Sequence, residues 1–289
     1  MDEDEKFQII DIDKVFKEKN PGLYKWIPGF VMSYIKRVIH QKEMNTILKK
    51  SVGIKEIDFA KQVIKELGVT IKFRGLQNIP SRGPVIIAGN HPLGGLDGVA
   101  LISAVGSIRK DVRFIVNDIL TNLTNFGEVF IPVNKLGSNA KSNLERIEKI
   151  YASDMAVLIF PAGLCSRKID GEIKDLPWQK SFVSKAQKYV HPIVPVFVIA
   201  RNSNWFYNLS KFRTSIGLKA NIEMFWLVDE MFKQKGKTIE FIVGKPILPE
   251  YLSPDINQKE WTEKIRAYIY NLINEPDISF EDFLKSRIK

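Results

Sequence analysis

A short apolar run that passes directly into a glycine-rich polar loop is the feature that most limits what this chain can fold into. Residues 85–88, Val-Ile-Ile-Ala, stand between Pro84 and Gly89 and have the composition of a β-strand buried on both faces. The next residues read Asn-His-Pro-Leu-Gly-Gly-Leu-Asp, in which proline and glycines exclude regular structure until a helix can begin near Asp97. Strands buried on both faces belong to parallel sheets covered by helices, so this stretch predicts an α/β fold.

The rest of the chain repeats this alternation of apolar strands and amphipathic helices. It predicts a largely parallel central sheet covered by helices on both faces. The further strands are predicted at 69–73, 112–116, 129–131, 156–160, 193–200 and 239–243. The helices are predicted at 57–67, 98–108, 118–123, 139–151, 179–189 and 261–272.

The N-terminal part differs from the rest in charge. Residues 1–13 carry six acidic side chains against one lysine, whereas residues 14–50 hold nine Lys and Arg against two Glu. Two Pro-Gly pairs interrupt the basic segment, so we expect several short helices there. We predict that residues 1–68 form an acidic tail and a helical membrane-associating segment, and that residues 69–289 form the α/β domain with its C-terminal helices.

Two stretches have a composition that suits a membrane surface. Residues 30–39 place Lys36 and Arg37 beside an apolar helical face, as in helices that lie in a membrane interface, although a helix packed on the core has the same pattern. Residues 204–232 are rich in aromatics, which fits either a core-facing helical pair or a membrane-facing lip or acyl-chain pocket. The net charge of +10 attracts anionic partners, and no nucleic-acid-binding motif is present, so a membrane surface with anionic lipids is the predicted partner.

Composition excludes several other classes. A single cysteine, Cys165, rules out an internal disulfide and fits a reducing compartment. The three histidines are far apart and no Cys/His cluster has metal-ligand spacing, so no metal site is predicted. No secretory signal is apparent, and apolar runs such as 193–200 fall far short of the roughly 20 residues that span a bilayer. We therefore expect a cytoplasmic protein that is peripheral on the inner face of the cell membrane.

His91 and Asp97 are the candidate catalytic pair. Reacting groups in open α/β sheets gather beyond the carboxyl ends of the strands, where both residues are expected. An aspartate can fix the tautomer of a histidine and stabilise its charged form, which makes the imidazole a directed base. The residues alone leave a second interpretation open, in which His91 satisfies a turn and Asp97 caps a helix.

Four motifs in order resemble those of the glycerolipid acyltransferases, the lysophosphatidate and lysophospholipid acyltransferase family. The resemblance covers roughly residues 70–250, and a late strand at 243–247 adds to it. The motifs are Asn90-His91 followed by Asp97, residues 127–135 (Gly-Glu-Val-Phe-Ile-Pro-Val-Asn-Lys), residues 160–167 (Phe-Pro-Ala-Gly-Leu-Cys-Ser-Arg) and residues 193–196 (Ile-Val-Pro-Val).

Three positions depart from the family pattern. Five residues separate His91 from Asp97, where the family usually has four. Asn134 stands near a position that usually holds Arg, and Ala162 replaces the Glu of Phe-Pro-Glu-Gly. Phe-Pro-Ala-Gly is shared with a bacterial branch that is often labelled hemolysin-like or aminolipid acyltransferase, and this chain resembles that branch most closely.

The resemblance implies an O-acyltransferase that moves a fatty acyl group from an acyl thioester to a hydroxyl of a lysolipid, either lysophosphatidate or a lysophospholipid. His91 would be the general base, oriented by Asp97. The departures make a hydroxyacyl amino acid the alternative acceptor, as in aminolipid synthesis. No bound cofactor is implied, because the donor, an acyl carrier protein or coenzyme A thioester, is a substrate.

The resemblance also implies a set of substrate-binding residues. Lys135 and Arg167 are candidates for contacting a phosphate or carboxylate, and backbone N–H groups around Gly163 for an oxyanion or an anionic headgroup. The whole set is Asn134, Lys135, Phe160, Pro161, Gly163, Ser166 and Arg167.

Two other classes of function stay open at this point. The chain could be a thioesterase or lipase with Ser166 or Cys165 as nucleophile, although Gly-Leu-Cys-Ser-Arg is not the Gly-x-Ser-x-Gly turn that exposes such a serine. It could also be a non-enzymatic lipid-binding protein on the same fold, because the motifs are altered.

Overall fold

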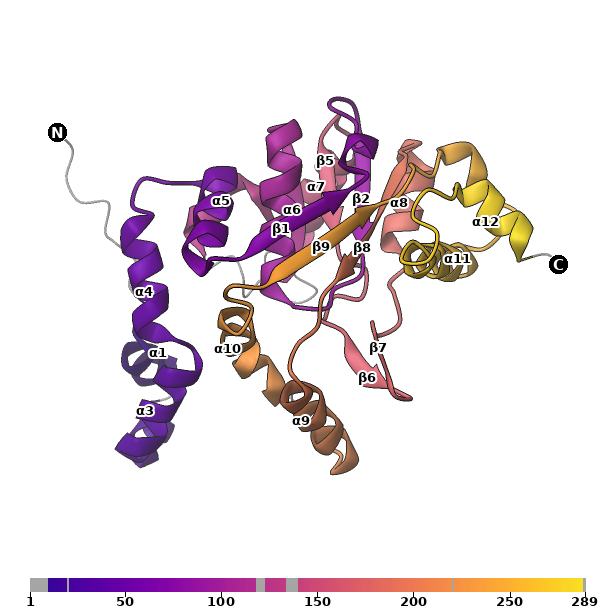
Figure 1. Cartoon of the computed structure of the whole chain (residues 1–289). Helices are drawn as coiled ribbons and strands as arrows, with labels where there is room; N and C mark the ends of the chain where they lie inside the picture. Colours follow the sequence, from indigo (N-terminus) through magenta and orange to yellow (C-terminus); the bar gives the residue numbers. More distant parts are fainter. Residues whose placement is uncertain (1–9, 20, 118–122, 134–139, 220, 288–289) are drawn as a thin grey trace.

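The alternating strands form one seven-stranded sheet in the computed structural model, which describes residues 10–19, 21–117, 123–133, 140–219 and 221–287 (Figure 1). The strand order is β1-β9-β8-β2-β5-β3-β4. Five neighbouring strands, from β8 to β4, run parallel, whereas β9 is antiparallel to β8 and pairs in parallel with β1. The predicted α/β class with a largely parallel sheet is therefore confirmed. The strands are β1 (Thr70–Arg74), β2 (Val85–Gly89), β3 (Val112–Asn117), β4 (Phe130–Val133), β5 (Ala156–Ile159), β8 (Ile193–Ile199) and β9 (Thr238–Val243).

Helices cover both faces of this sheet (Figure 1). Successive side chains of a strand point to opposite faces, so Ile87 joins one buried cluster and Ile86 the other. The first cluster packs against α5 (Glu56–Leu67) and α6 (Gly95–Ile108). The second packs against α7 (Ala140–Tyr151), α8 (Ser181–Tyr189), α11 (Gln258–Asn271) and α12 (Phe280–Ser286).

Short helices occupy the basic N-terminal segment, as predicted. They are α1 (Ile12–Lys19), α2 (Pro21–Trp26), α3 (Gly29–Val38) and α4 (Gln41–Lys50). His40, between α3 and α4, holds them to the domain: its Nε2 lies 2.9 Å from Asp229 Oδ1, and its ring stacks on Phe232. Within the described ranges, no helix is long and apolar enough to cross a bilayer. The division of the chain at residue 68 stays a prediction.

The aromatic stretch after β8 forms α9 (Asn204–Ser215), a 3₁₀ helix η4 (Ile222–Trp226) and α10 (Leu227–Phe232). Phe206 and Tyr207 are buried, whereas Phe212 and Phe225 are exposed. One face of this stretch thus packs inward, as in the core-facing interpretation, and the membrane-facing lip or acyl-chain pocket stays a prediction.

No helix was predicted at α12, and the prediction also missed the hairpin of β6 (Arg167–Ile169) and β7 (Glu172–Lys174), which directly follows the third motif. Asp170 and Gly171 form its turn with φ of 51° and 87°. An Asp-Gly pair between two short alternating stretches is a hairpin signal, so the sequence did carry this information. The helix predicted at 118–123 falls outside the described residues except for Leu123.

Candidate active site

The loop after β2 presents His91 at the carboxyl edge of the parallel strands, as predicted. The strand before it is tied to β8 by the buried Asn90, whose Nδ2 donates to the Val198 carbonyl (3.1 Å) and whose Oδ1 accepts from the Val198 N–H (2.7 Å). Asn202, beyond the end of β8, donates from Nδ2 to the Pro92 carbonyl (3.2 Å). The Asn90 amide uses both ends of its side chain, and such a buried amide fixes a loop strongly because neither partner can return to water.

Asp97 meets His91 from the first turn of α6. Its carboxylate is fully buried and lies 3.1 Å from His91 Nδ1. It also accepts the backbone N–H of Leu93 and of Gly98, each at 2.9 Å. The predicted contact between His91 and Asp97 is confirmed.

The extra residue between the pair is accommodated at Gly94. This residue has φ 86° and ψ −106°, a conformation that only glycine adopts readily. The chain therefore turns back on itself before α6 begins at Gly95, and the Asp97 carboxylate returns to the imidazole. A side chain at position 94 would also meet Leu227, with its Cβ 3.0 Å from a methyl carbon.

The pairing sets the tautomer of the imidazole. An ionised carboxylate only accepts hydrogen bonds, so Nδ1 of His91 carries the proton that faces Asp97. Nε2 is then left with its lone pair, which is the arrangement of a general base.

The third motif packs directly against this histidine. The Phe160 ring stacks on the His91 ring with centroids 4.2 Å apart and an interplanar angle of 22°. The Pro161 carbonyl accepts the Gln179 N–H (2.9 Å), and the Gly163 N–H donates to the Phe160 carbonyl (3.0 Å). The Gly163 N–H is thus used within the turn, whereas those of Ala162 and Leu164 have no hydrogen-bond partner in the described part of the chain. The binding roles of Phe160, Pro161 and Gly163 stay predictions.

Neither candidate nucleophile is presented for attack. Cys165 is buried, and burial raises the pKa of its thiol to about 11, so the thiolate is scarce near neutrality. Ser166 is buried and its hydroxyl donates to Asp175 (2.5 Å). The geometry therefore does not favour the thioesterase or lipase alternative.

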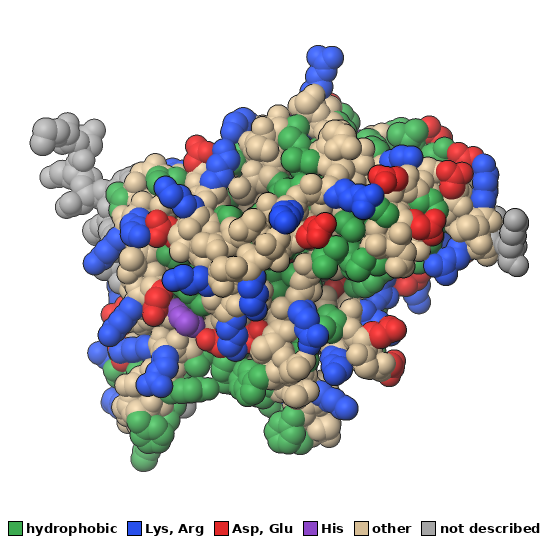
Figure 2. Space-filling view, in the orientation of Figure 1, with side chains coloured by type: hydrophobic (Ala, Val, Ile, Leu, Met, Phe, Trp, Pro, Cys, Tyr) green, Lys and Arg blue, Asp and Glu red, His purple; other side chains and the backbone are tan. Residues whose placement is uncertain are grey.

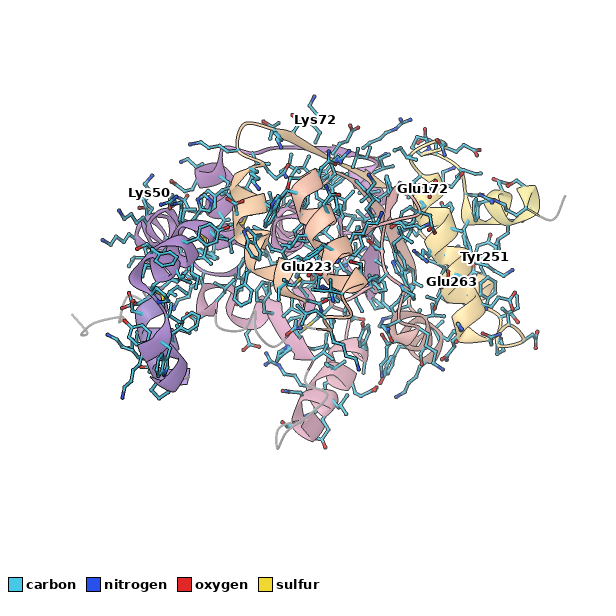
Figure 3. All side chains as sticks on the ribbon, turned by 90° about the horizontal axis from the view of Figure 1, so that it is seen from below. Lys50, Lys72, Glu172, Glu223, Tyr251 and Glu263 are labelled. Carbon is cyan, nitrogen blue, oxygen red and sulfur yellow. The ribbon has the colours of Figure 1, made fainter. Side chains whose placement is uncertain are left out.

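Arg167 lies in a buried ion-pair cluster. One of its terminal N–H groups donates to Glu223 (2.8 Å) and the other to the Cys165 carbonyl (2.6 Å). Arg213 shares the same glutamate, with Nε 2.8 Å from Oε2. Figure 3 shows Glu223 near the middle of the face seen from below. The headgroup-binding role of Arg167 stays a prediction, and such a contact would require its guanidinium to rearrange.

The second motif ends beyond the described residues. β4 carries Ile131, Pro132 and Val133 to the carboxyl edge of the sheet, and Asn134 and Lys135 lie outside the described residues. Their predicted substrate-binding roles remain predictions.

Sequence reasoning missed Asp175 and Trp178, which lie between the hairpin and α8. Asp175 is almost fully buried and contacts both the His91 loop and Ser166. Burial raises the pKa of its carboxyl group, while hydrogen bonds from Ser166, the His91 N–H and Trp178 act in the opposite direction. The only sequence signal was an aspartate directly before Leu-Pro-Trp, and nothing near it in the sequence points to His91.

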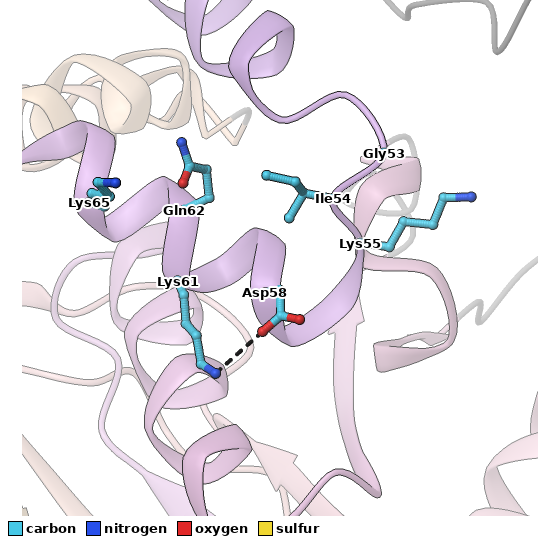
Figure 4. A pocket seen from close by; sticks show the side chains of 7 residues that line it. All are labelled: Gly53, Ile54, Lys55, Asp58, Lys61, Gln62 and Lys65. Atoms are coloured by element: carbon cyan, nitrogen blue, oxygen red, sulfur yellow. Dashed lines mark hydrogen bonds and ion pairs between the residues drawn. The ribbon is translucent and has the colours of Figure 1, made fainter.

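A pocket of about 430 Å³ lies elsewhere, around the turn that leads into α5 (Figure 4). Its walls come from the turn and from polar side chains of the helix, and the Lys61 ammonium pairs with Asp58 at 3.3 Å. None of its lining residues belongs to the His91 loop or to the third motif. The lining residues are Gly53, Ile54, Lys55, Asp58, Lys61, Gln62 and Lys65.

Within the described residues, no group of three or more His, Cys, Asp or Glu side chains could hold a metal ion.

Comparison with known proteins gives consistent matches. A family model described as acyltransferase matches residues 14–279. The chain is 40% identical over 270 residues to a lyso-glycine lipid O-acyltransferase of Phocaeicola vulgatus, which covers 93% of this chain and 97% of that protein. It is 38% identical over 270 residues to a lyso-glycine lipid O-acyltransferase of Bacteroides thetaiotaomicron, with 93% and 99% covered. The crystal structure of a 1-acyl-sn-glycerophosphate acyltransferase from Thermotoga maritima aligns with 84% of this chain and 92% of that chain, at a TM-score of 0.44 and 16% identity.

Proposed function

This chain belongs to the acyltransferase family and is an O-acyltransferase, and we propose that it acylates the hydroxyl of a lyso-glycine lipid. The observation that carries the proposal is the match to two lyso-glycine lipid O-acyltransferases along almost their whole length. The sequence motifs had made lysophosphatidate or a lysophospholipid the first choice of acceptor. These relatives favour the alternative, an aminolipid acceptor. The Phe-Pro-Ala-Gly motif at Phe160 supports the same choice.

The His91–Asp97 pair supplies the chemistry of transfer. Nε2 of His91 takes the proton of the acceptor hydroxyl as its oxygen attacks the thioester carbon. A carbon–oxygen bond forms, the carbon–sulfur bond breaks, and the proton passes from Nε2 to the departing thiolate. Asp97 stabilises the imidazolium between these two steps, because the two side chains lie 3.1 Å apart with the carboxylate buried. The acyl donor, a carrier-protein or coenzyme A thioester, stays a prediction.

The turn after β5 supports a proposal for the oxyanion that forms on the thioester carbon. Backbone N–H groups that are not used inside a turn are suitable donors for such a charge. Those of Ala162 and Leu164 meet this condition within the described residues, beside the Phe160 ring on which His91 stacks. We assign them as candidate oxyanion donors.

Lys135 and Arg167 are the candidates for contacting the anionic headgroup of the acceptor. Replacing Arg167 by Lys keeps the charge but removes the planar pair of donors. A rise in the acceptor KM with an unchanged donor KM would support the contact. An unchanged acceptor KM with a lower melting temperature would assign Arg167 to the Glu223 cluster alone.

The predicted membrane contact is supported by exposed aromatic side chains on one side of the molecule. Trp26 is 85% exposed and Phe30 77%. Phe212 of α9 is 61% exposed and Phe225 of η4 is 62% exposed. In Figure 2, hydrophobic side chains gather at the lower ends of α3 and α9, and basic side chains surround them. Aromatic and basic residues together suit the interface of an anionic bilayer, where the lipid acceptor would be found.

The acceptor is tested with purified protein, labelled acyl thioester and two acceptors in parallel. We expect a kcat/KM for the lyso-glycine lipid at least tenfold above that for lysophosphatidate. His91→Ala should lower turnover by about 10²–10⁴-fold, the usual contribution of a positioned base. Preferential acylation of lysophosphatidate would refute the proposed acceptor, and near-normal turnover by folded His91→Ala would refute the mechanism.

The membrane contact is tested with vesicles that contain anionic lipid. Replacing Trp26 and Phe30 by Ser should weaken vesicle binding about tenfold or more, because each ring loses an apolar environment. Val190→Ser is the matched control, since Val190 is 69% exposed but lies before β8, at the opposite edge of the sheet. Equal binding by the two variants would place the membrane contact elsewhere.

A further inference from the structure

The buried carboxylate of Asp175 contacts the loop that carries His91. Asp175 follows β7 and is 1% exposed. Its backbone is fixed on both sides, because its N–H donates to the Tyr270 hydroxyl (2.8 Å) and its carbonyl accepts from Arg266 (2.6 Å). Both partners belong to α11, so the sheet and its C-terminal helix hold Asp175 rigidly.

The carboxylate of Asp175 accepts three hydrogen bonds. Oδ1 accepts the Ser166 hydroxyl (2.5 Å) and the backbone N–H of His91 (3.2 Å), and Oδ2 accepts the Trp178 indole N–H (2.9 Å). A carboxylate is costly to bury and is tolerated when its oxygens are satisfied in this way. The three donors therefore fix the orientation of this carboxylate beside the loop that carries His91.

Ser166 completes the hold on His91. Its backbone N–H donates to the His91 carbonyl at 2.8 Å. The N–H of His91 goes to Asp175 and the carbonyl to Ser166, and these two residues are joined by their own hydrogen bond. Both polar backbone groups of His91 are thus bound by one connected pair of residues, the main chain of Ser166 and the side chain of Asp175, just beyond the point where β2 ends.

We propose that Asp175 is a positioning residue for acyl transfer, which fixes the backbone of His91 through Ser166 and its own carboxylate so that Nε2 faces the acceptor hydroxyl. This inference rests on the proposed role of His91 as the base. Trp178 acts one step further away by orienting the Asp175 carboxylate. Asp97 and Asp175 divide the task, since the first holds the imidazole ring and the second holds the main chain that carries it.

The first test measures steady-state transfer by Asp175→Asn, Trp178→Phe and Asp111→Asn. A displacement of about 1 Å at a reacting group can cost about 10²-fold in rate, so Asp175→Asn should lower kcat by about 10- to 100-fold while both KM values stay within about twofold. Trp178→Phe removes one hydrogen bond and should lower kcat about 2- to 10-fold. Asp111 accepts two hydrogen bonds from Arg109 at the opposite edge of the sheet, and its variant should keep the wild-type kcat.

A double-mutant cycle separates positioning from general support of the fold. In the His91→Ala background, single-turnover transfer should fall less than twofold when Asp175→Asn is added, because no imidazole remains to be positioned.

The possible results are distinct. Active His91→Ala would refute the catalytic role of His91 itself. If His91→Ala is inactive but Asp175→Asn and Trp178→Phe transfer at the wild-type rate, the positioning role is wrong. An equal loss from Asp175→Asn in both backgrounds would also overturn it. Should Asp175→Asn fail to fold, Trp178→Phe and Ser166→Ala carry the same cycle.

Discussion

Replacing Asp97 by Asn is the most direct perturbation of the proposed chemistry. The carboxylate accepts three N–H groups, from the His91 ring, Leu93 and Gly98. An asparagine has one acceptor oxygen and one NH₂ group, so at least one of these buried donors must face another donor. Leaving such a group unpaired costs about 1–3 kcal/mol.

This cost can be converted into observable quantities. In a domain of this size, about 1 kcal/mol lowers the melting temperature by roughly 2–4 °C, so Asp97→Asn should melt roughly 2–12 °C lower than the wild type. The effect on catalysis is larger and separate. With an amide beside it, the His91 ring can adopt the tautomer with its proton on Nε2, which no longer accepts the hydroxyl proton. We expect kcat to fall by about 10²–10⁴-fold.

The assay follows labelled acyl transfer to lyso-glycine lipid at a temperature well below both melting points. Circular dichroism and thermal melting establish that the variant is folded. Asp111→Asn is the control for loss of a carboxylate that accepts two hydrogen bonds away from the site. If folded Asp97→Asn retains activity within about tenfold of the wild type, the orientation of His91 by Asp97 is not required and the reasoning fails.

Two further predictions concern the loop and the pH dependence of stability. Gly94→Ala should unfold at lower temperature and lose most activity, because φ at this position is 86° and the new Cβ would lie 3.0 Å from Leu227. Gly95→Ala is the control and should be tolerated, because a Cβ there meets nothing within 4 Å. Thermal melts and transfer assays of the two variants check this. Hydrogen bonds, first of all from Lys185, lower the pKa of Glu148 to about 2, so its contribution to stability is present above about pH 4.5 and is lost as the pH falls toward 2. Because the Glu148 side chain is 40% exposed, screening by solvent limits the stability cost of Glu148→Gln at pH 7 to about 1 kcal/mol or less. Urea unfolding should show that the difference in stability between the wild type and this variant is smaller at pH 2.5 than at pH 7. An equal cost at both pH values would contradict the ion-pair explanation.

The fold and the catalytic pair were predictable because their signals are local. The run at 85–88 is apolar on both faces and ends in glycine, which is what a buried parallel strand requires. His91 and Asp97 are six residues apart, and the glycines between them allow the short return that brings them together.

The surroundings of the pair could not be predicted, because they come from distant parts of the chain. Asp175 is 84 residues from His91, and Arg167 is 56 residues from Glu223. A single sequence shows neither contact, so Arg167 could be read only as a free cation. Ser166 was assigned to the substrate, whereas its nearest partner is a carboxylate that sequence reasoning did not single out.

The ties that hold the catalytic loop also set the order in which the site can be completed. α5 and α6 pack together with only β1 and β2 as strands between them along the chain, and contacts of low sequence separation form more quickly than distant ones. The side chain of Asn90 finds its partner only at Val198, 108 residues later, and Pro92 only at Asn202. During synthesis, which proceeds from the N-terminus, His91 is therefore made long before the strand that immobilises it, and the catalytic loop cannot be fixed until β8 has left the ribosome and docked beside β2.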